Sequence, residues 1–195
     1  MNKRVLSLKK LSNGLLKNGT KEMTGRSRGI RIREAIEKAL GEAKGTHRII
    51  LDFSGIGAVD FSWADEVVAK MVSRLWSGEY GEKFLLLKGL TSSQAENIHV
   101  ALERKRLVVI TIVPEGWQII GSLNNYLIHT LNQVMKRKRL TLRQLSEEER
   151  IGMNTSGTRL LNLYKKRLVA RLEESRMGKD DPYRGRQFVY RSLLL

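Results

Sequence analysis

The sequence predicts two domains of different class, an α/β domain followed by an α+β domain. Strand and helix patterns alternate from residue 33 to residue 113, whereas helical patterns and then two strand patterns follow residue 123. One of only two prolines, Pro114, stands where the pattern changes. Charge divides the chain at similar places, because a nearly balanced middle lies between two cationic flanks.

In the first domain, apolar residues at helical spacing alternate with short apolar runs that are typical of buried strands. The spacing predicts helices over 33–43, 62–76 and 91–107, and strands over 47–56, 83–90 and 107–113. Alternation within residues 1–10 favours an additional edge strand, with a basic arm lying on DNA as the alternative. The expected division is a basic segment 1–25, a domain 26–116 and a domain 117–195, with the boundary at VPEGW (113–117).

The distribution of charge indicates a polyanionic partner. The net charge is +16, from 36 Lys and Arg against 20 Asp and Glu. Residues 1–33 carry ten basic groups and one acidic group, residues 34–116 ten and twelve, and residues 117–195 sixteen and seven. Cationic excess of this kind binds nucleic acid through counterion release, so double-stranded DNA is the first candidate.

Several classes of protein are disfavoured by what the sequence lacks. There is no cysteine, so disulfides, thiolate zinc sites and cysteine nucleophiles are excluded. The histidines His47, His99 and His129 share no metal-ligand spacing, and no hydrolase or phosphate-loop motif occurs. We therefore expect no enzyme activity, no metal and no cofactor. No signal peptide or membrane span is evident, which predicts a soluble cytoplasmic protein with no membrane partner.

After the boundary, helical patterns cover 124–139, 141–149 and 154–167, with Thr141 and Asn154 as expected N-caps. Strand patterns over 171–176 and 186–194 flank a Gly/Asp/Pro loop, as in a β-hairpin. The run LTLRQLSEEERIGMNTSGTRLLNLYKKR (140–167) and the later GRQFVYRSL (185–193) resemble winged helix-turn-helix regulators. Gly152 lies in the expected turn between helices, and Arg167 stands where that family usually has glycine.

The resemblance implies that the third helix of this module enters the major groove of DNA. With Leu160 and Leu163 facing the core, the side chains expected to reach bases or phosphates are Thr155, Ser156, Thr158, Arg159 and Asn162. Sequence-independent phosphate contacts are expected from Lys165, Lys166, Lys179, Arg184 and Arg186.

In the first domain, LDFSGI (51–56) and SWADE (62–66) resemble the STAS-like domain of unknown function. Its parent family is that of sulfate transporters and anti-sigma factor antagonists. In the antagonists, a histidine-kinase-like ATPase phosphorylates a serine in the corresponding loop. The resemblance implies a small sheet with helices on one side. It also places Asp60 on the aspartate of the antagonists' loop and Ser62 on the phosphoacceptor.

Ser62 has two interpretations. We favour an N-cap, with Asp65 at the third helical position, as in a capping box. Phosphorylation is the alternative, and Asp65 and Glu66 would repel the added charge. Contact with a partner protein is expected at Asp60, Trp63, Asp65 and Glu66.

The leading hypothesis is a DNA-binding regulator whose STAS-like domain binds another protein or a second copy of the chain. One alternative is a partner-switching adaptor of a histidine-kinase-like ATPase, controlled at Ser62. Another is a structural subunit of a nucleoprotein complex in a mobile element or an antiviral defence system.

Overall fold

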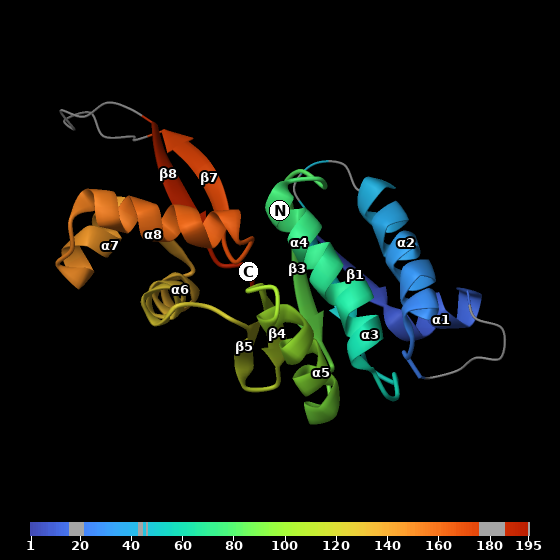
Figure 1. Ribbon diagram of the computed structural model, residues 1–195. Coiled ribbons are helices and arrows are strands. Elements are labelled where there is room, and N and C mark those ends of the chain that lie inside the picture. Colours follow the sequence, from blue (N-terminus) through green and yellow to red (C-terminus); the bar gives the residue numbers. More distant parts are fainter. Residues whose placement is uncertain (16–21, 43–44, 46, 176–185, 195) are drawn as a thin grey trace. The chain divides into compact units, whose positions relative to one another are not determined.

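The computed structural model describes residues 1–15, 22–42, 45, 47–175 and 186–194, and the chain divides into two compact units (Figure 1). Unit 1 is Met1–Leu123 and unit 2 is Asn124–Leu195. The division therefore lies after residue 123, and not at VPEGW as expected from the sequence. The reason is a strand, β5 (Gly116–Gly121), that pairs with the preceding strand and so remains in unit 1.

Unit 1 contains a five-stranded sheet in the order β1-β2-β3-β4-β5. The strands preceding β5 are β1 (Asn2–Ser7), β2 (His47–Asp52), β3 (Lys83–Lys88) and β4 (Val108–Val113). The pairings of β1 with β2, β2 with β3 and β3 with β4 are parallel, whereas β5 runs antiparallel to β4. The edge strand expected within residues 1–10 is thus β1.

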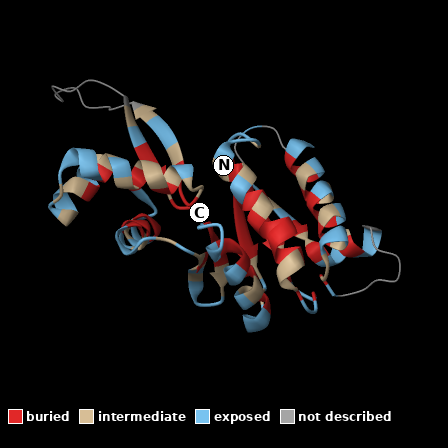
Figure 2. Ribbon diagram, viewed as in Figure 1, coloured by how far each residue is buried: buried red, intermediate tan, exposed pale blue. Residues whose placement is uncertain are grey.

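The helices of unit 1 pack on one face of this sheet. They are α1 (Leu8–Leu15), α2 (Arg26–Glu42), the run α3 (Phe61–Ala64), η1 (Asp65–Ala69) and α4 (Lys70–Ser77), and α5 (Ser92–Glu103). A single hydrophobic core contains apolar side chains from these helices. It also contains strand side chains that point to the helical face of the sheet, among them Leu51, Leu87 and Val109. Buried residues accordingly concentrate on the strands and on the inward sides of the helices (Figure 2).

The predicted helix 62–76 is continuous but not uniform. Between α3 and α4 the chain makes a π-turn over Asp65–Ala69, in which the backbone N–H of Lys70 bonds to the carbonyl oxygen of Asp65. A π-turn takes up one residue more than a turn of regular α-helix does. Helix α2 packs against this turn at Gly29, where an added Cβ would lie 3.1 Å from the Cβ and Cγ of Glu66. The missing side chain at Gly29 lets the two helices approach closely.

Unit 2 combines helices with a small antiparallel sheet. Its elements are α6 (Asn125–Arg137), β6 (Arg139–Thr141), α7 (Leu142–Glu149), α8 (Met153–Lys165), β7 (Ala170–Ser175) and β8 (Arg186–Arg191). The strand order is β6-β8-β7, and both pairings are antiparallel. The helices and the hairpin strands match the sequence expectation, whereas β6 was not expected.

Helix ends in unit 2 follow the expected caps only in part. Thr141 caps α7 through a capping box with Gln144, as the sequence indicates. Helix α8 instead begins at Met153 after Gly152, so Asn154 is not its N-cap. Arg167 has φ 57°, a left-handed backbone conformation that favours glycine.

Across the residues that the structure describes, no helix is both long and apolar enough to cross a membrane.

Candidate functional site

The helix start in AVDFSWADEV (58–67) is organised by Asp60. Its Oδ1 accepts a hydrogen bond from the backbone N–H of Trp63 at 2.7 Å, and its Oδ2 accepts one from the N–H of Gly25 at 2.8 Å. Asp60 is therefore the N-cap of α3, and the expected cap role of Ser62 is wrong. The same carboxylate joins this helix start to the residue that precedes α2.

Ser62 is the second residue of α3 and is half-buried. Within the described part of the chain, no side-chain hydrogen bond involves its hydroxyl. Next to it, the ring of Phe61 lies under the guanidinium of Arg104, whose Cζ is 4.6 Å from the ring centroid. The hydroxyl of Ser62 thus has no capping role, and the residue as a whole is half-buried.

The residues expected to contact a partner beside Ser62 are mostly inside the unit. The side chain of Trp63 is fully buried and meets Phe53 edge-to-face, with ring centroids 6.1 Å apart. The side chain of Glu66 has no exposed surface, and that of Asp65 is only 11% exposed. As the unit stands, these three side chains form its interior and not a binding surface; Asp60 is half-buried.

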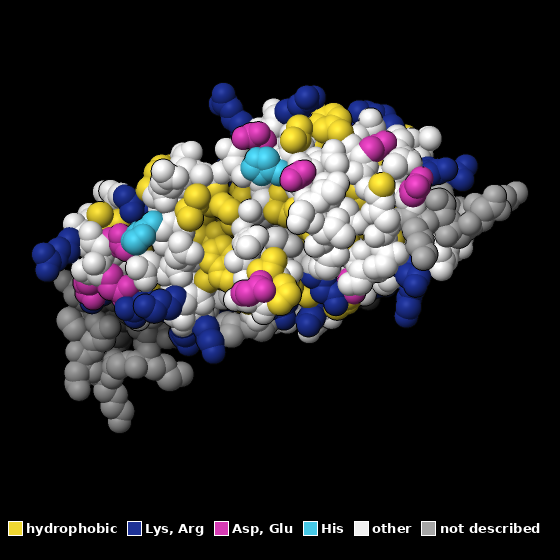
Figure 3. Space-filling view, turned by 90° about the horizontal axis from the view of Figure 1, so that it is seen from below, with side chains coloured by type: hydrophobic (Ala, Val, Ile, Leu, Met, Phe, Trp, Pro, Cys, Tyr) yellow, Lys and Arg dark blue, Asp and Glu magenta, His cyan; other side chains and the backbone are white. Residues whose placement is uncertain are grey.

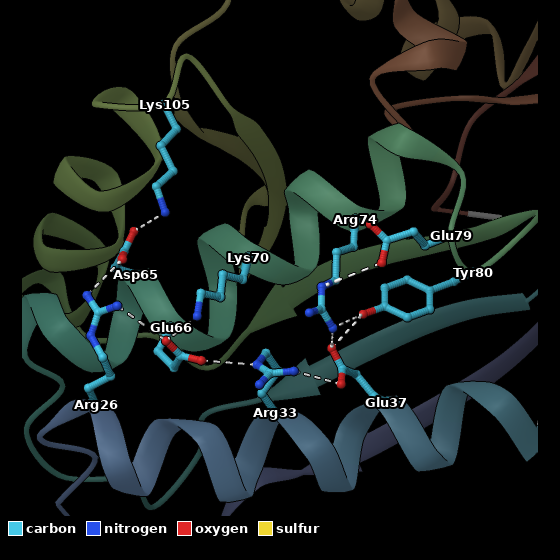
Figure 4. A network of polar contacts seen from close by, with 10 residues as sticks. All are labelled: Arg26, Arg33, Glu37, Asp65, Glu66, Lys70, Arg74, Glu79, Tyr80 and Lys105. Atoms are coloured by element: carbon cyan, nitrogen blue, oxygen red, sulfur yellow. Dashed lines mark hydrogen bonds and ion pairs between the residues drawn. The ribbon is translucent and has the colours of Figure 1, made fainter.

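Glu66 is held by cations from two helices (Figure 4). Arg33 Nε donates to its Oε1 at 3.2 Å, Lys70 Nζ donates to its Oε2 at 2.6 Å, and Arg26 lies 3.6 Å from the same oxygen. Burial alone would raise the pKa of Glu66, but the bonds from Lys70 and Arg33 outweigh it and hold the pKa below the ordinary value. The buried carboxylate is therefore ionised and fully committed to its partners.

Asp65 is neutralised in the same way, by Lys105 in the turn that follows α5 and by Arg26, whose guanidinium lies 3.3 Å away. The sequence suggested that Asp65 and Glu66 would repel a phosphate on Ser62. Because both carboxylates are paired with cations, that repulsion is largely compensated.

The network continues along α2 to Glu37. One oxygen of Glu37 accepts a 2.7 Å bond from Arg33, and the other accepts bonds from Arg74 and, at 2.6 Å, from the hydroxyl of Tyr80. Burial would raise the pKa of Glu37, but the bonds from Tyr80 and Arg33 lower it overall. Burial and the Glu37 carboxylate raise the pKa of Tyr80 to about 12. This network of charges joins α2 to η1 and α4, and its carboxylates Glu37, Asp65 and Glu66 are each paired with cations.

The second candidate site is the outer face of α8. Thr155, Thr158 and Lys165 are exposed there, and Arg159 and Asn162 are half-buried. Ser156 is different, because its side chain is fully buried and its hydroxyl donates to the carbonyl of Gly152 at 3.3 Å. The expectation that Ser156 reaches DNA is therefore wrong.

Of the remaining cations expected to bind phosphates, only Lys166 has a side chain that the structure describes. Lys166 caps the end of α8 and is half-buried, and this burial lowers its pKa. Lys179 and Arg184 lie outside the described residues. Arg186 begins β8, and its side chain is likewise outside the description.

One polar residue on this face was missed by the sequence reasoning. Asn154 is exposed in the first turn of α8, four residues before Thr158, and so shares its side of the helix. Its four-residue spacing from Thr158 could have indicated that both lie on the same face. The sequence instead predicted Asn154 as the N-cap of the helix, a position that Gly152 occupies.

Arginine side chains stack on aromatic rings of α8 and of the elements beside it. The Cζ of Arg159 lies 5.4 Å from the ring centroid of Tyr126 on α6. The guanidinium of Arg171 on β7 lies between two rings, 4.4 Å from Tyr164 and 4.3 Å from Phe188. These contacts fix two cations that would otherwise be free to change rotamer.

No cluster of potential metal ligands occurs in the described residues. Two histidines instead pair with acids on the surface. His99 lies 3.7 Å from Glu103 and His129 lies 2.7 Å from Glu149, and Figure 3 shows histidine side chains beside acidic ones. In the same view, lysine and arginine side chains project at several separate places.

Comparison with known families bears on unit 1. Residues 28–93 match the family model of the STAS-like domain of unknown function. This stretch is STAS-like. It extends from the first turn of α2 to the start of α5 and contains the Asp60 helix start and the π-turn, which confirms the resemblance drawn from LDFSGI and SWADE. The match does not reach unit 2, and no curated protein matches the chain.

Proposed function

We propose that the protein is a DNA-binding regulator. In this proposal, unit 2 is a winged helix-turn-helix that contacts duplex DNA through α8, and the STAS-like region binds a protein partner or a second copy of the chain. The observation that carries the proposal is the outward face of α8. It combines hydroxyl, amide and ammonium groups on a helix whose opposite side is closed by Leu160 and Leu163.

The arrangement of unit 2 supports this interpretation. Helix α8 follows α7 after a three-residue turn that contains Gly152, and a β-hairpin follows α8. This is the order in which a helix-turn-helix module presents its second helix to the major groove, with the hairpin as the wing.

Charge supports the same partner. Residues 124–195 contain sixteen Lys and Arg against seven Asp and Glu, a difference of nine positive charges. Attraction of this size acts on the phosphate backbone of any sequence, so the affinity should fall steeply as salt rises.

The test is fluorescence anisotropy with a labelled mixed-sequence duplex across a series of salt concentrations. We expect binding by the wild-type chain, with log K falling linearly as log salt rises. Combining Arg159→Ala with Lys165→Ala should weaken binding and reduce the salt slope, because two cations are removed from this face.

The matched control combines Arg31→Ala with Lys38→Ala, which removes two exposed cations from α2 in unit 1. Its effect should be much smaller. Binding that does not depend on salt, or an equal loss in both double variants, contradicts a DNA contact through α8.

A second candidate function, partner switching at Ser62, is favoured by the state of its hydroxyl. Ser62 is partly exposed, is not used as a cap, and lies beside carboxylates that are already neutralised. The test is mass spectrometry after incubation with ATP and a purified serine kinase of the anti-sigma-factor type. Phosphate on Ser62, absent in Ser62→Ala, supports this function, whereas phosphate only on the exposed Ser54 counts against it.

A further inference from the structure

Tyr126 is one of the exposed aromatic side chains of unit 2. It lies in the first turn of α6, and 43% of its surface is exposed. Its ring does not serve the core of the unit, yet it lies next to the guanidinium of Arg159, whose Cζ is 5.4 Å from the ring centroid. An exposed aromatic that contacts an arginine on a neighbouring helix can restrict that arginine to one direction.

The phenol of Tyr126 is itself held in place. The side-chain N–H of Asn124 donates to the Tyr126 hydroxyl at 3.3 Å. Asn124 is the N-cap of α6, but its side chain makes no capping bond. The amide that could have capped the helix is instead directed to the tyrosine. A chain of contacts thus runs from Asn124 through Tyr126 to Arg159.

Arg159 lies at the flank of the polar face of α8 and not at its centre. It follows Thr158 by one residue, so its side chain projects about 100° around the helix from that of Thr158. Asn154 and Lys165 lie on the same side as Thr158, and both are exposed. If the centre of this face enters a groove of DNA, a flank residue meets the wall of the groove, which consists of phosphates.

We propose that Arg159 contacts a backbone phosphate of bound duplex DNA and that Tyr126 is the positioning residue that orients it for this contact. The inference rests on the proposed function of unit 2 and adds the kind of DNA group that Arg159 binds. Stacking on the ring limits the rotamers of the guanidinium before DNA arrives. Less side-chain freedom is then lost on binding.

The experiment measures the affinity of the full chain for two duplexes of unrelated sequence across a salt series. Tyr126→Leu removes the ring and keeps an apolar side chain, and it should weaken binding to both duplexes by the same roughly two- to fivefold factor. Tyr126→Phe retains the ring and should stay within about twofold of wild type, because the ring face makes the contact. Arg159→Ala should lower the salt slope by about one on both duplexes.

A double variant separates positioning from a general loss of structure. In the Arg159→Ala background, Tyr126→Leu should have no further effect on affinity, since there is no guanidinium left to orient. An equal loss in both backgrounds would mean that Tyr126 acts on folding alone, which overturns the inference.

Three other outcomes also decide the question. Wild-type affinity in Tyr126→Leu overturns the positioning role. A change of preference between the two duplexes in Arg159→Ala, with an unchanged salt slope, overturns the phosphate contact in favour of a base contact. Absence of salt-dependent binding by the wild-type chain overturns the proposed function and, with it, this inference.

Discussion

The guanidinium of Arg33 donates from Nε to the Oε1 of Glu66 at 3.2 Å, and this bond joins α2 to the π-turn of the neighbouring helix. The Glu66 side chain has no exposed surface and the Arg33 side chain is 11% exposed. Bringing both charges out of water is costly, so the pair is stable only because each partner is further bonded, Glu66 to Lys70 and Arg33 to Glu37. Removal of one member should therefore be more damaging than its own bonds suggest.

Replacement of the buried carboxylate tests this point. Glu66→Gln should lower the free energy of unfolding of unit 1 by about 3 kcal/mol, because it removes one of the two carboxylates that compensate the buried Arg33. Tryptophan fluorescence in a urea titration reports this unit alone, since Trp63, Trp76 and Trp117 all lie in it. Glu79→Gln is the control: Glu79 is 54% exposed and pairs with Arg74 at 3.6 Å, so its loss should cost less than about 0.5 kcal/mol. Equal stability of the two variants would contradict a structural role for the Glu66 network.

Acid should destabilise unit 1 through the same groups. Folding lowers the pKa values of Glu66 and Glu37 below the ordinary 4.5, so the unfolded chain binds protons first. The stability that they contribute is complete above about pH 4.5 and is lost as the pH falls through the lowered pKa values. Urea titrations between pH 7 and pH 3 should show this decline. A curve for Glu66→Gln that falls as steeply as that of the wild type would exclude Glu66 as a source.

Alkaline titration should identify Tyr80. Its pKa is raised from 10 to about 12, so its phenol remains protonated in the folded state when ordinary tyrosines ionise. The associated stability is present below pH 10 and is lost as the pH rises through 12. Difference absorbance between wild type and Tyr80→Phe should therefore show a phenol ionising about two pH units late. Ionisation of this group near pH 10 would contradict the bond to Glu37.

The two candidate caps of α3 can be told apart by substitution. Asp60→Ala removes the acceptor for the N–H groups of Trp63 and Gly25 and should cost about 1–2 kcal/mol in the same fluorescence assay. Ser62→Ala should change the stability by less than about 0.5 kcal/mol, since its hydroxyl caps nothing. The reverse order would restore Ser62 as the cap.

A glycine at the end of α6 should stabilise unit 2. Lys138 is exposed and has φ 67°, a left-handed conformation that costs a side-chain-bearing residue about 1 kcal/mol. Lys138→Gly should relieve this cost and slow amide hydrogen exchange in α6. Lys136→Gly, two residues earlier and still helical, should instead accelerate exchange, because glycine within a helix costs about 1 kcal/mol. Faster exchange in Lys138→Gly would show that another contact holds this residue.

Periodicity in the sequence was sufficient to predict most helices and strands, because the spacing of apolar residues within one element can be read from that segment alone. The elements that were not expected are α1, β5 and β6, and the wrong helix cap depended on a distant residue. Strand β6 is three residues long, and β5 begins and ends in glycine, so neither carries a clear pattern. Asp60 and Ser62 are both good cap types. The selection of Asp60 coincides with a bond to Gly25, thirty-five residues away, which no local pattern reveals.

The sequence predicted which face of α8 is polar and exposed, but it did not predict correctly every residue on that face. Ser156 lies four residues before Leu160 and therefore shares its buried side, a signal that was present in the sequence. The stacking of Arg159 on Tyr126 was not predictable, because it depends on how α6 and α8 pack.

The π-turn has a consequence for the direction in which the second half of this helix points. If residues 65–69 formed a regular α-helix, Lys70 and Arg74 would be turned by about 100° relative to the residues before the turn, because the π-turn takes up one residue more than an α-helical turn does. Arg74 could then no longer reach Glu37 while Asp60 holds the start of the helix against Gly25. The irregular turn thus sets the two ends of the helix in phase, and a regular helix of the same sequence would lose one of its two attachments.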